Sequence, residues 1–364
     1  MKILYGVPGE GMGHATRSRV ILDHLVKRHD VKIVVSGRAH AYLKKFFPDV
    51  EEIRGLHLAY EGNTLDRSRT VFEFFKDAPD DMADNVETYF KIARSFKPDA
   101  VIADFESFAW LYGRRHRIPV LSIDNMQIIN RCEHGDVIPK QLLGSYRMTK
   151  MVIKAKLPGC YHYLITTFFF PKVRKPRTSL YPPILRKEIL DARARAERQE
   201  HFLVYQTSPS NTELLDVLAR MAPAKFRVYG YRRDENRGNV QLKDFSEAGF
   251  VSDLATCRAV IAGGGFSLMG EAVYLGKPML SVPLEKQFEQ QLNALYLGRL
   301  GYGEYHLAAD EEAIRGFLAR SDQYAQNLSG HQQDGNKEIL GAVDRLLGEI
   351  ASAHKKSRSA GGRG

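Results

Sequence analysis

A glycine-rich turn between an apolar strand and a helix, at residues 259–276, most constrains the fold of this chain. The apolar run 259–262 enters three glycines, a helical stretch then ends at Gly276, and a second short strand follows at 278–282. A strand, a helix and a strand of these lengths form a βαβ unit, whose two strands are parallel. We therefore predict an α/β protein built on a mainly parallel sheet.

The glycine turn also suits an anionic ligand, for which we expect a diphosphate. Glycines let backbone N–H groups approach phosphate, and the helix that follows presents its positive end. Glu271 falls about one and a half turns into this helix, where its carboxylate could accept hydrogen bonds from a sugar diol. The same glycines would suit a tight turn that binds nothing, so they do not identify a ligand by themselves.

A second strand, glycine loop and helix open the chain, at residues 2–7, 8–14 and 15–28. The loop does not complete the G-x-G-x-x-G pattern, and no acidic residue closes the next strand, so a nicotinamide-binding domain is the weaker interpretation. His14 lies at the start of the helix, where the helix dipole disfavours the imidazolium ion and favours a neutral base. A helix cap or an exposed side chain is the alternative for His14.

Two acidic residues end strands in the same half of the chain. Asp104 ends the strand 98–104, and Asp124 follows the strand 119–123. Carboxyl ends of parallel strands meet at one edge of a sheet, where ligands bind, so we expect both acids near His14. Asp104 could orient and charge-stabilise His14 as a His-Asp dyad does. Helix capping or a salt bridge is the alternative for each acid.

The length of 364 residues predicts about two domains. After a stretch rich in proline and basic residues, the alternation of strands and helices starts again. The predicted parts are an N-terminal Rossmann-like domain at 1–175, a linker at 176–200, a C-terminal domain at 201–353 and a disordered basic tail at 354–364. In the second half, Ser208 lies where a first crossover loop could meet phosphate, with helix capping as the alternative.

The stretch 264–294 resembles the donor-binding signature of nucleotide-sugar glycosyltransferases of the GT-B fold, which has two Rossmann-like domains facing across a cleft. The matching residues are Gly264-Gly265, Glu271-Ala272, Gly276-Lys277-Pro278, Pro283 and Glu289 to Ala294. The chain is similar over nearly its whole length to the peptidoglycan N-acetylglucosaminyltransferase and UDP-glucuronosyltransferase-like group. In that group, a loop resembling 11–14 carries a general-base His, and a strand resembling the one that ends at Asp104 supplies its acidic partner.

This resemblance implies an inverting, metal-independent transferase that moves a sugar from a nucleotide diphosphate sugar, UDP-linked, to an acceptor hydroxyl on a lipid-linked or cell-envelope glycan. It implies no cofactor and no metal ion. The implied catalytic residues are His14 and Asp104. The implied donor-binding residues are Gly11, Gly13, Ser208, Gly264, Gly265, Phe266, Ser267, Glu271, Glu289 and Gln290. Two positions depart from the family pattern, because Glu289 replaces an Asp and Gly263 stands where His or Ser is frequent.

Charge and hydropathy bear on partners. The net charge is +10, and basic residues crowd between Lys140 and Arg198, which fits an anionic ligand or membrane surface as well as a solvated basic linker. These segments lack interleaved aromatic positions, so we expect no nucleic-acid binding. No apolar run is long enough to span a bilayer and no secretory signal is evident. We expect a cytoplasmic protein that would meet a lipid-linked acceptor at the inner face of the cell membrane.

Two other functions remain compatible with these residues. A UDP-sugar epimerase on the same fold would use the same donor site together with water. A non-catalytic protein that senses a nucleotide sugar or an anionic polymer would bind without turnover. Products formed without any acceptor would identify the epimerase, and binding without hydrolysis or transfer would identify the sensor.

Overall fold

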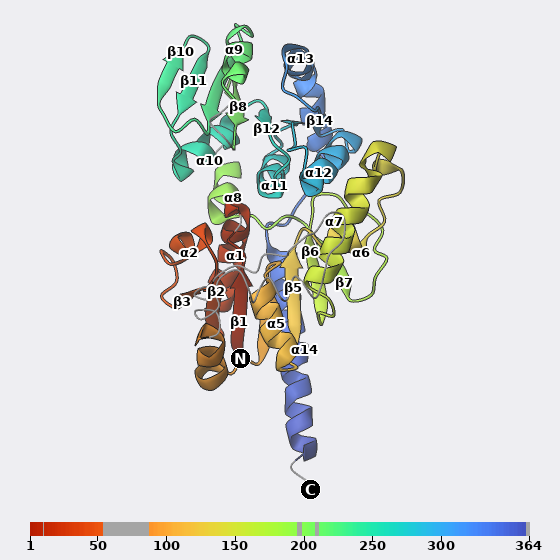
Figure 1. Ribbon diagram of the computed structural model, residues 1–364. Helices are drawn as coiled ribbons and strands as arrows, with labels where there is room; N and C mark the ends of the chain where they lie inside the picture. Colours follow the sequence, from red (N-terminus) through yellow and green to blue (C-terminus); the bar gives the residue numbers. More distant parts are fainter. Residues whose placement is uncertain (10, 54–86, 195–198, 208–210, 362–364) are drawn as a thin grey trace. The chain divides into compact units, whose positions relative to one another are not determined.

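The computed structural model describes the chain except for residues 10, 54–86, 195–198, 208–210 and 362–364. The chain divides into two compact units. Unit 1 comprises Met1–Glu133, Gly144–Ile184 and Asn336–Gly364, and unit 2 comprises His134–Leu143 and Leu185–Gly335. Each unit has its own seven-stranded sheet with helices packed against it (Figure 1). The predicted α/β class, with two mainly parallel sheets, is confirmed.

The sheet of unit 1 has the order β3-β2-β1-β4-β5-β6-β7, and every neighbouring pair is parallel. Its strands are β1 (Lys2–Val7), β2 (Asp30–Val35), β3 (Val50–Glu52), β4 (Ala100–Ala103), β5 (Val120–Asp124), β6 (His162–Thr166) and β7 (Thr178–Tyr181). The direction of strand addition reverses between β1 and β4. Ligands of such sheets bind at the carboxyl ends of the strands beside this reversal.

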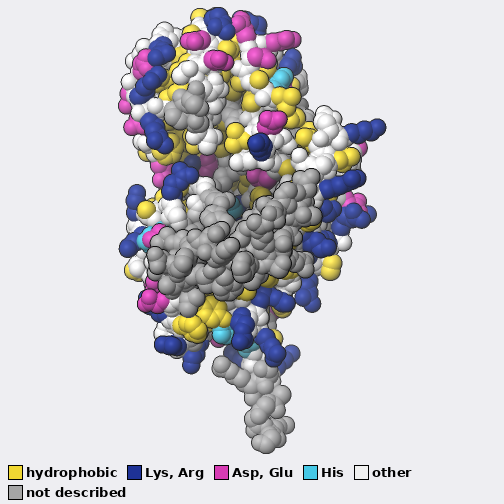
Figure 2. All heavy atoms as spheres, viewed as in Figure 1, with side chains coloured by type: hydrophobic (Ala, Val, Ile, Leu, Met, Phe, Trp, Pro, Cys, Tyr) yellow, Lys and Arg dark blue, Asp and Glu magenta, His cyan; other side chains and the backbone are white. Residues whose placement is uncertain are grey.

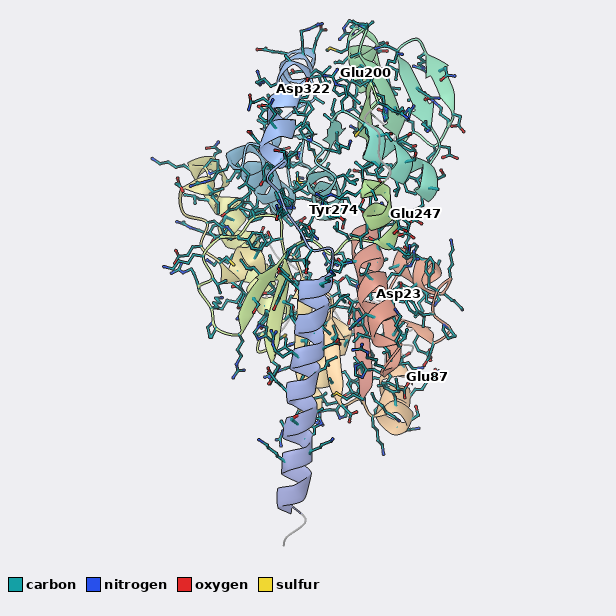
Figure 3. All side chains as sticks on the ribbon, turned by 180° about the vertical axis from the view of Figure 1, so that it is seen from behind. Asp23, Glu87, Glu200, Glu247, Tyr274 and Asp322 are labelled. Carbon is teal, nitrogen blue, oxygen red and sulfur yellow. The ribbon has the colours of Figure 1, made fainter. Side chains whose placement is uncertain are left out.

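Helices cover both faces of this sheet. They are α1 (Met12–Leu25), α2 (Arg38–Leu43), α5 (Ser107–Arg115), α6 (Ile128–Arg131), α7 (Leu143–Lys156) and α14 (Lys337–Gly361), with a π-helical turn at Ile92–Phe96. On one face, apolar residues of α1, α2 and α14 share a buried core with the strands, including Ile21, Leu43 and Val343. Figure 3 shows α14 along this face. On the other face α5 packs closely, because a Cβ at Gly113 would lie 2.5 Å from the side chain of Val120.

The sheet of unit 2 has the order β10-β11-β9-β8-β12-β13-β14 and reverses between β8 and β12. Its strands are β8 (His201–Tyr205), β9 (Lys225–Tyr229), β10 (Glu235–Arg237), β11 (Val240–Lys243), β12 (Val260–Ala262), β13 (Met279–Ser281) and β14 (Gly303–Tyr305). Only the pair of β10 and β11 is antiparallel among the described strands of this sheet. The predicted βαβ unit is thus present as β12, α11 and β13.

The helices of unit 2 connect these strands. They are α8 (Lys187–Arg193), α9 (Glu213–Ala219), α10 (Glu247–Thr256), α11 (Phe266–Tyr274), α12 (Phe288–Arg299) and α13 (Glu311–Leu328), with short 3-10 turns at Gly135–Val137 and Lys140–Leu142. A buried core joins strands β8, β9 and β12 to α9 and α13, with Phe226 and Phe317 among its largest side chains. In the part of the chain that the structure describes, no helix combines the length and apolar character that crossing a membrane requires.

The unit boundaries differ from the predicted domains. Within the predicted linker, β7 completes the sheet of unit 1 and α8 belongs to unit 2, and the chain passes from one unit to the other after Ile184. The helix α14 was expected in the C-terminal domain but packs in unit 1, and it continues as far as Gly361, into the tail that was expected to be disordered. Alanine, lysine and arginine in that tail favour helix, which explains the longer element.

Candidate functional site

The first crossover of unit 1 places His14 at the carboxyl edge of the sheet. Strand β1 ends at Val7, and α1 begins at Met12 with Gly11 before it. Gly11 has a φ of +83°, a conformation that glycine adopts without strain, and α1 has no side-chain cap at its N-terminus. Gly13 and His14 therefore lie in the first turn of α1, beside the reversal point of the sheet. The side chain of His14 is one-fifth exposed, with 20% of its surface accessible.

Strand β4 brings Asp104 to the same edge, and the structure pairs it with His14. The His14 Nδ1 and Asp104 Oδ1 atoms are 2.9 Å apart. Asp104 is fully buried, and it also accepts a hydrogen bond of 2.9 Å from the hydroxyl of Ser18. Both partners of the predicted dyad thus lie together, and their catalytic role stays a prediction.

Arg17 is the member of this site that the sequence analysis missed. It lies three residues after His14, which is one turn along the same face of α1. Its Nε donates to Asp104 Oδ2 at 2.8 Å, its Nη2 donates to Asp104 Oδ1, and its Nη1 donates to Asn125 Oδ1 at 2.6 Å. The guanidinium is buried and therefore ties α1 to the ends of β4 and β5. The His14 to Arg17 spacing on one helix is the only sequence signal for this contact.

The charges of the cluster set the protonation of His14. Burial alone would raise the pKa of Asp104, but Arg17 and His14 outweigh it and hold that pKa well below its usual range. Burial and the nearby Arg17 lower the pKa of His14, so its imidazole is neutral at pH 7. Arg17 Nη2 also lies 2.6 Å from His14 Nδ1. Because the ionised carboxylate is the stronger acceptor, we place the imidazole proton on Nδ1, which donates it in a hydrogen bond to Asp104. Nε2 is then the basic nitrogen.

Asp124, the other acid expected at this edge, has a local role. It accepts hydrogen bonds from the hydroxyl of Ser122 at 2.6 Å and from the backbone N–H of Gln127 at 2.7 Å. These contacts shape the turn that leads from β5 into α6. Burial raises the pKa of Asp124 to about 6. The hydrogen bonds of Asp124 therefore support capping of this turn, whereas its neighbour Asn125 contacts Arg17.

The glycine turn of unit 2 leads from β12 into α11. A Cβ at Gly264 would lie 2.4 Å from the backbone oxygen of Gln290, so only glycine fits there. Gly265 is the residue before the helix, and a Cβ there would meet open space. The first turn of α11, which includes Phe266 and Ser267, has no acidic residue and no side-chain cap. This N-terminus therefore keeps the positive end of its dipole uncompensated by its own residues.

The acid and amide cluster of α12 braces this turn. The side-chain oxygen of Gln290 accepts hydrogen bonds from the N–H groups of Gly264, at 3.3 Å, and Leu284, at 3.1 Å. Asn293 donates to the oxygen of Gly264 at 3.1 Å and to Glu289 at 2.8 Å. Gln290 and Glu289, expected to bind the donor, thus lie against the turn expected to hold the diphosphate. Because the N–H of Gly264 already donates to Gln290, an anion would have to bind the backbone N–H groups of the residues that follow Gly264.

Glu271 lies on α11 and is buried, with 9% of its side chain exposed. Its two carboxylate oxygens accept hydrogen bonds of 2.7 and 2.9 Å from Nε and Nη2 of Arg186. Burial raises the pKa of Glu271, and Arg186 opposes that rise. Arg186 lay in the predicted linker and was not identified as a site residue. Ser208, the remaining predicted donor residue, lies outside the described residues.

Comparison with known proteins indicates the family of this chain. Residues 1–321 match the family model described as glycosyl transferase family 1. A protein of Methanosarcina acetivorans named an uncharacterized glycosyltransferase is 24% identical over 97% of this chain and 100% of its own length. A Bacillus cereus protein, UDP-N-acetylglucosamine--N-acetylmuramyl-(pentapeptide) pyrophosphoryl-undecaprenol N-acetylglucosamine transferase 3, is 24% identical over 31% of this chain and 35% of its length. The structure of Phytolacca americana UGT2, complexed with UDP-2fluoro-glucose and pterostilbene, superposes with a TM-score of 0.65 at 15% identity, covering 97% of this chain and 98% of that one.

Proposed function

Because this chain belongs to glycosyl transferase family 1 and has the GT-B fold, we propose that it is an inverting, metal-independent enzyme that transfers a sugar from a UDP-sugar to an acceptor hydroxyl. The observation that carries this proposal is the buried cluster of His14, Asp104 and Arg17 at the carboxyl edge of the unit 1 sheet. It provides a neutral imidazole with a fixed tautomer, which is what a general base near neutral pH requires. The uncapped N-terminus of α11 supports a diphosphate-bearing donor.

The proposed reaction moves one proton and one sugar. The Nε2 atom of His14 takes the proton of the acceptor hydroxyl, and Asp104 stabilises the imidazolium that forms. The acceptor oxygen attacks the anomeric carbon from the side opposite the leaving group, so the configuration inverts. The bond from that carbon to the diphosphate oxygen breaks, and UDP leaves with the electron pair. The positive end of α11 would stabilise the developing diphosphate charge.

Sugar transfer with a UDP-sugar panel tests this function. We expect UDP release and a mass increase on an acceptor from a lipid and glycan extract, measured by mass spectrometry, with the wild-type chain. Reactions without acceptor serve as the control, because a UDP-sugar epimerase would convert its donor there and a transferase would not. Turnover only with donors carrying another nucleotide would overturn the UDP assignment.

We further propose that the acceptor is lipid-linked and that unit 1 meets an anionic membrane from the cytoplasmic side. The helix α7 carries no acidic residue, and Arg147, Lys150 and Lys154 recur along it at helical spacing. Met151 on the same helix is exposed, as is Phe170 beyond it. Figure 2 shows Lys and Arg side chains on the side of unit 1 that α7 forms. The undecaprenol in the name of the Bacillus cereus relative supports a lipid carrier.

Vesicle co-sedimentation tests the membrane contact. The double substitution Arg147→Gln and Lys154→Gln should weaken binding to phosphatidylglycerol-containing vesicles by about fivefold for each cation removed. Both side chains are exposed, so the fold should tolerate the change. The matched control is Lys225→Gln with Arg232→Gln, two exposed cations of unit 2. Equal loss in both double variants, or equal binding to pure phosphatidylcholine, would contradict the contact.

A further inference from the structure

Arg186 makes three charged hydrogen bonds inside unit 2. Besides the two bonds to Glu271, its Nη1 donates to Glu247 Oε1 on α10 at 2.9 Å. The helix α8, which begins at the next residue, also places Arg193 4.5 Å from the ring centre of Tyr274 on α11. Figure 3 labels Glu247 and Tyr274 beside α8. The guanidinium, 11% exposed, is therefore fixed between two helices, and its planar fork faces one carboxylate.

The geometry of the fork leaves Glu271 able to bind more. A carboxylate has about four lone-pair positions, two on each oxygen. A bidentate guanidinium uses one on each oxygen and fixes the plane of the carboxylate. One acceptor position therefore stays on each oxygen, and two adjacent hydroxyl groups are the donors that such a pair of positions fits.

The positive charge of Arg186 also favours the acceptor capacity of the Glu271 carboxylate. A buried carboxylate without a cation partner tends to take up a proton, and a protonated carboxyl loses part of its acceptor capacity. Arg186 opposes the effect of burial on Glu271. Lysine would keep the charge but not the fork, because an ammonium group is a point charge without fixed planar geometry.

We propose that Arg186 is a positioning residue for donor recognition, which fixes the plane of the Glu271 carboxylate and turns it toward the 2′ and 3′ hydroxyls on the ribose of a nucleoside diphosphate. This inference rests on the proposed function, because it takes the sugar diol expected beside Glu271 to be the ribose of the nucleotide-sugar donor. Arg186 acts through Glu271, and Glu247 holds Arg186 from the other side. Selectivity for the ribose diol is therefore a property of the three residues together.

Titration calorimetry of the full chain with UDP and with its 2′,3′-dideoxy analogue tests this role. The wild type should bind UDP at least about tenfold more tightly than the dideoxy analogue, since hydrogen bonds to a charged group are lost with the hydroxyls. Arg186→Lys should lower UDP affinity about tenfold and leave the affinity of the analogue unchanged. A merely structural role would weaken both ligands alike. Glu247→Gln should also lower the affinity for UDP relative to that for the dideoxy analogue, by a smaller factor than Arg186→Lys.

A second pair of variants distinguishes the loss of the proposed contact from misfolding. Glu271→Gln should abolish the preference for UDP, and Arg186→Met combined with Glu271→Gln should lose nothing more, because no buried acid is then left unpaired. Equal weakening of both ligands by Arg186→Lys, or an unchanged preference, would overturn the inference while UDP binding by the wild type still supports the proposed function. Failure of the wild type to bind UDP would instead overturn the donor assignment, and the inference with it.

Discussion

His14→Ala is expected to lower kcat for sugar transfer by about 10²–10⁴-fold, the usual contribution of a general base. UDP affinity should stay near that of the wild type, because the diphosphate and ribose contacts are assigned to other residues. The His14 ring is part-exposed, and its hydrogen bonds to described residues lie within its cluster, so removing it should leave unit 1 folded. Steady-state rates, together with calorimetric titration of UDP, separate the two effects.

The matched control for this variant is His24→Gln. His24 lies on the same helix, α1, and pairs with Asp344 of α14 at 2.8 Å, away from Asp104. Its rate should stay within about twofold of the wild type, as for most substitutions outside a special site. Full transfer activity in His14→Ala on the true acceptor would refute the general-base assignment.

Arg17→Met is expected to destabilise unit 1 by about 3–5 kcal/mol, the usual cost of leaving one partner of a buried ion pair uncompensated. The reason is that Asp104 is 1% exposed and Arg17 supplies two of its hydrogen bonds. Trp110, the one tryptophan of the chain, lies on α5 of unit 1, so its fluorescence in a urea titration follows this unit. An unchanged urea midpoint would contradict the role of Arg17 as the partner of Asp104.

The same variant should change the pH dependence of transfer. In the wild type, Arg17 helps to lower the pKa of His14, so the neutral base persists below pH 6.5 and activity falls only as the pH drops further. Without Arg17 one of the cations that disfavour the imidazolium is gone while Asp104 remains, so the pKa of His14 rises and the acid limb of kcat moves to higher pH. Arg17→Lys keeps a positive charge, so its acid limb should stay close to that of the wild type.

Hydrophobic periodicity and glycine loops predicted the two parallel sheets because both signals are local. The assignment of α14 failed for the opposite reason. Its apolar residues, such as Val343 and Leu346, indicate an amphipathic helix, but periodicity does not say which core they enter. Neighbourhood in the chain favoured unit 2, whereas the structure packs them in unit 1. Burial against a distant sheet is a tertiary property that one sequence does not contain.

The site shows the same limit residue by residue. His14 and Asp104 follow strand ends, where topology alone predicts that side chains converge. Arg17 and Arg186 look like ordinary surface cations in the sequence, since a charged residue on a helix or in a basic segment is usually solvated. Only the fold shows that each is buried against a carboxylate. Gln290 likewise accepts a hydrogen bond from Gly264, a contact that the sequence motif does not predict.

The packing of α14 in unit 1 also affects the order in which the two units can fold during translation. Ribosomes add about 5–20 residues per second from the N-terminus, and domains usually fold as they emerge. Residues 185–335 leave the ribosome before α14 does, whereas the core of unit 1 needs Ile339, Val343 and Ile350 to cover its strands. Unit 2 can therefore complete its fold first, although its chain begins later. Part of the apolar face of the nascent β1 to β7 segment must therefore stay uncovered until α14 has emerged.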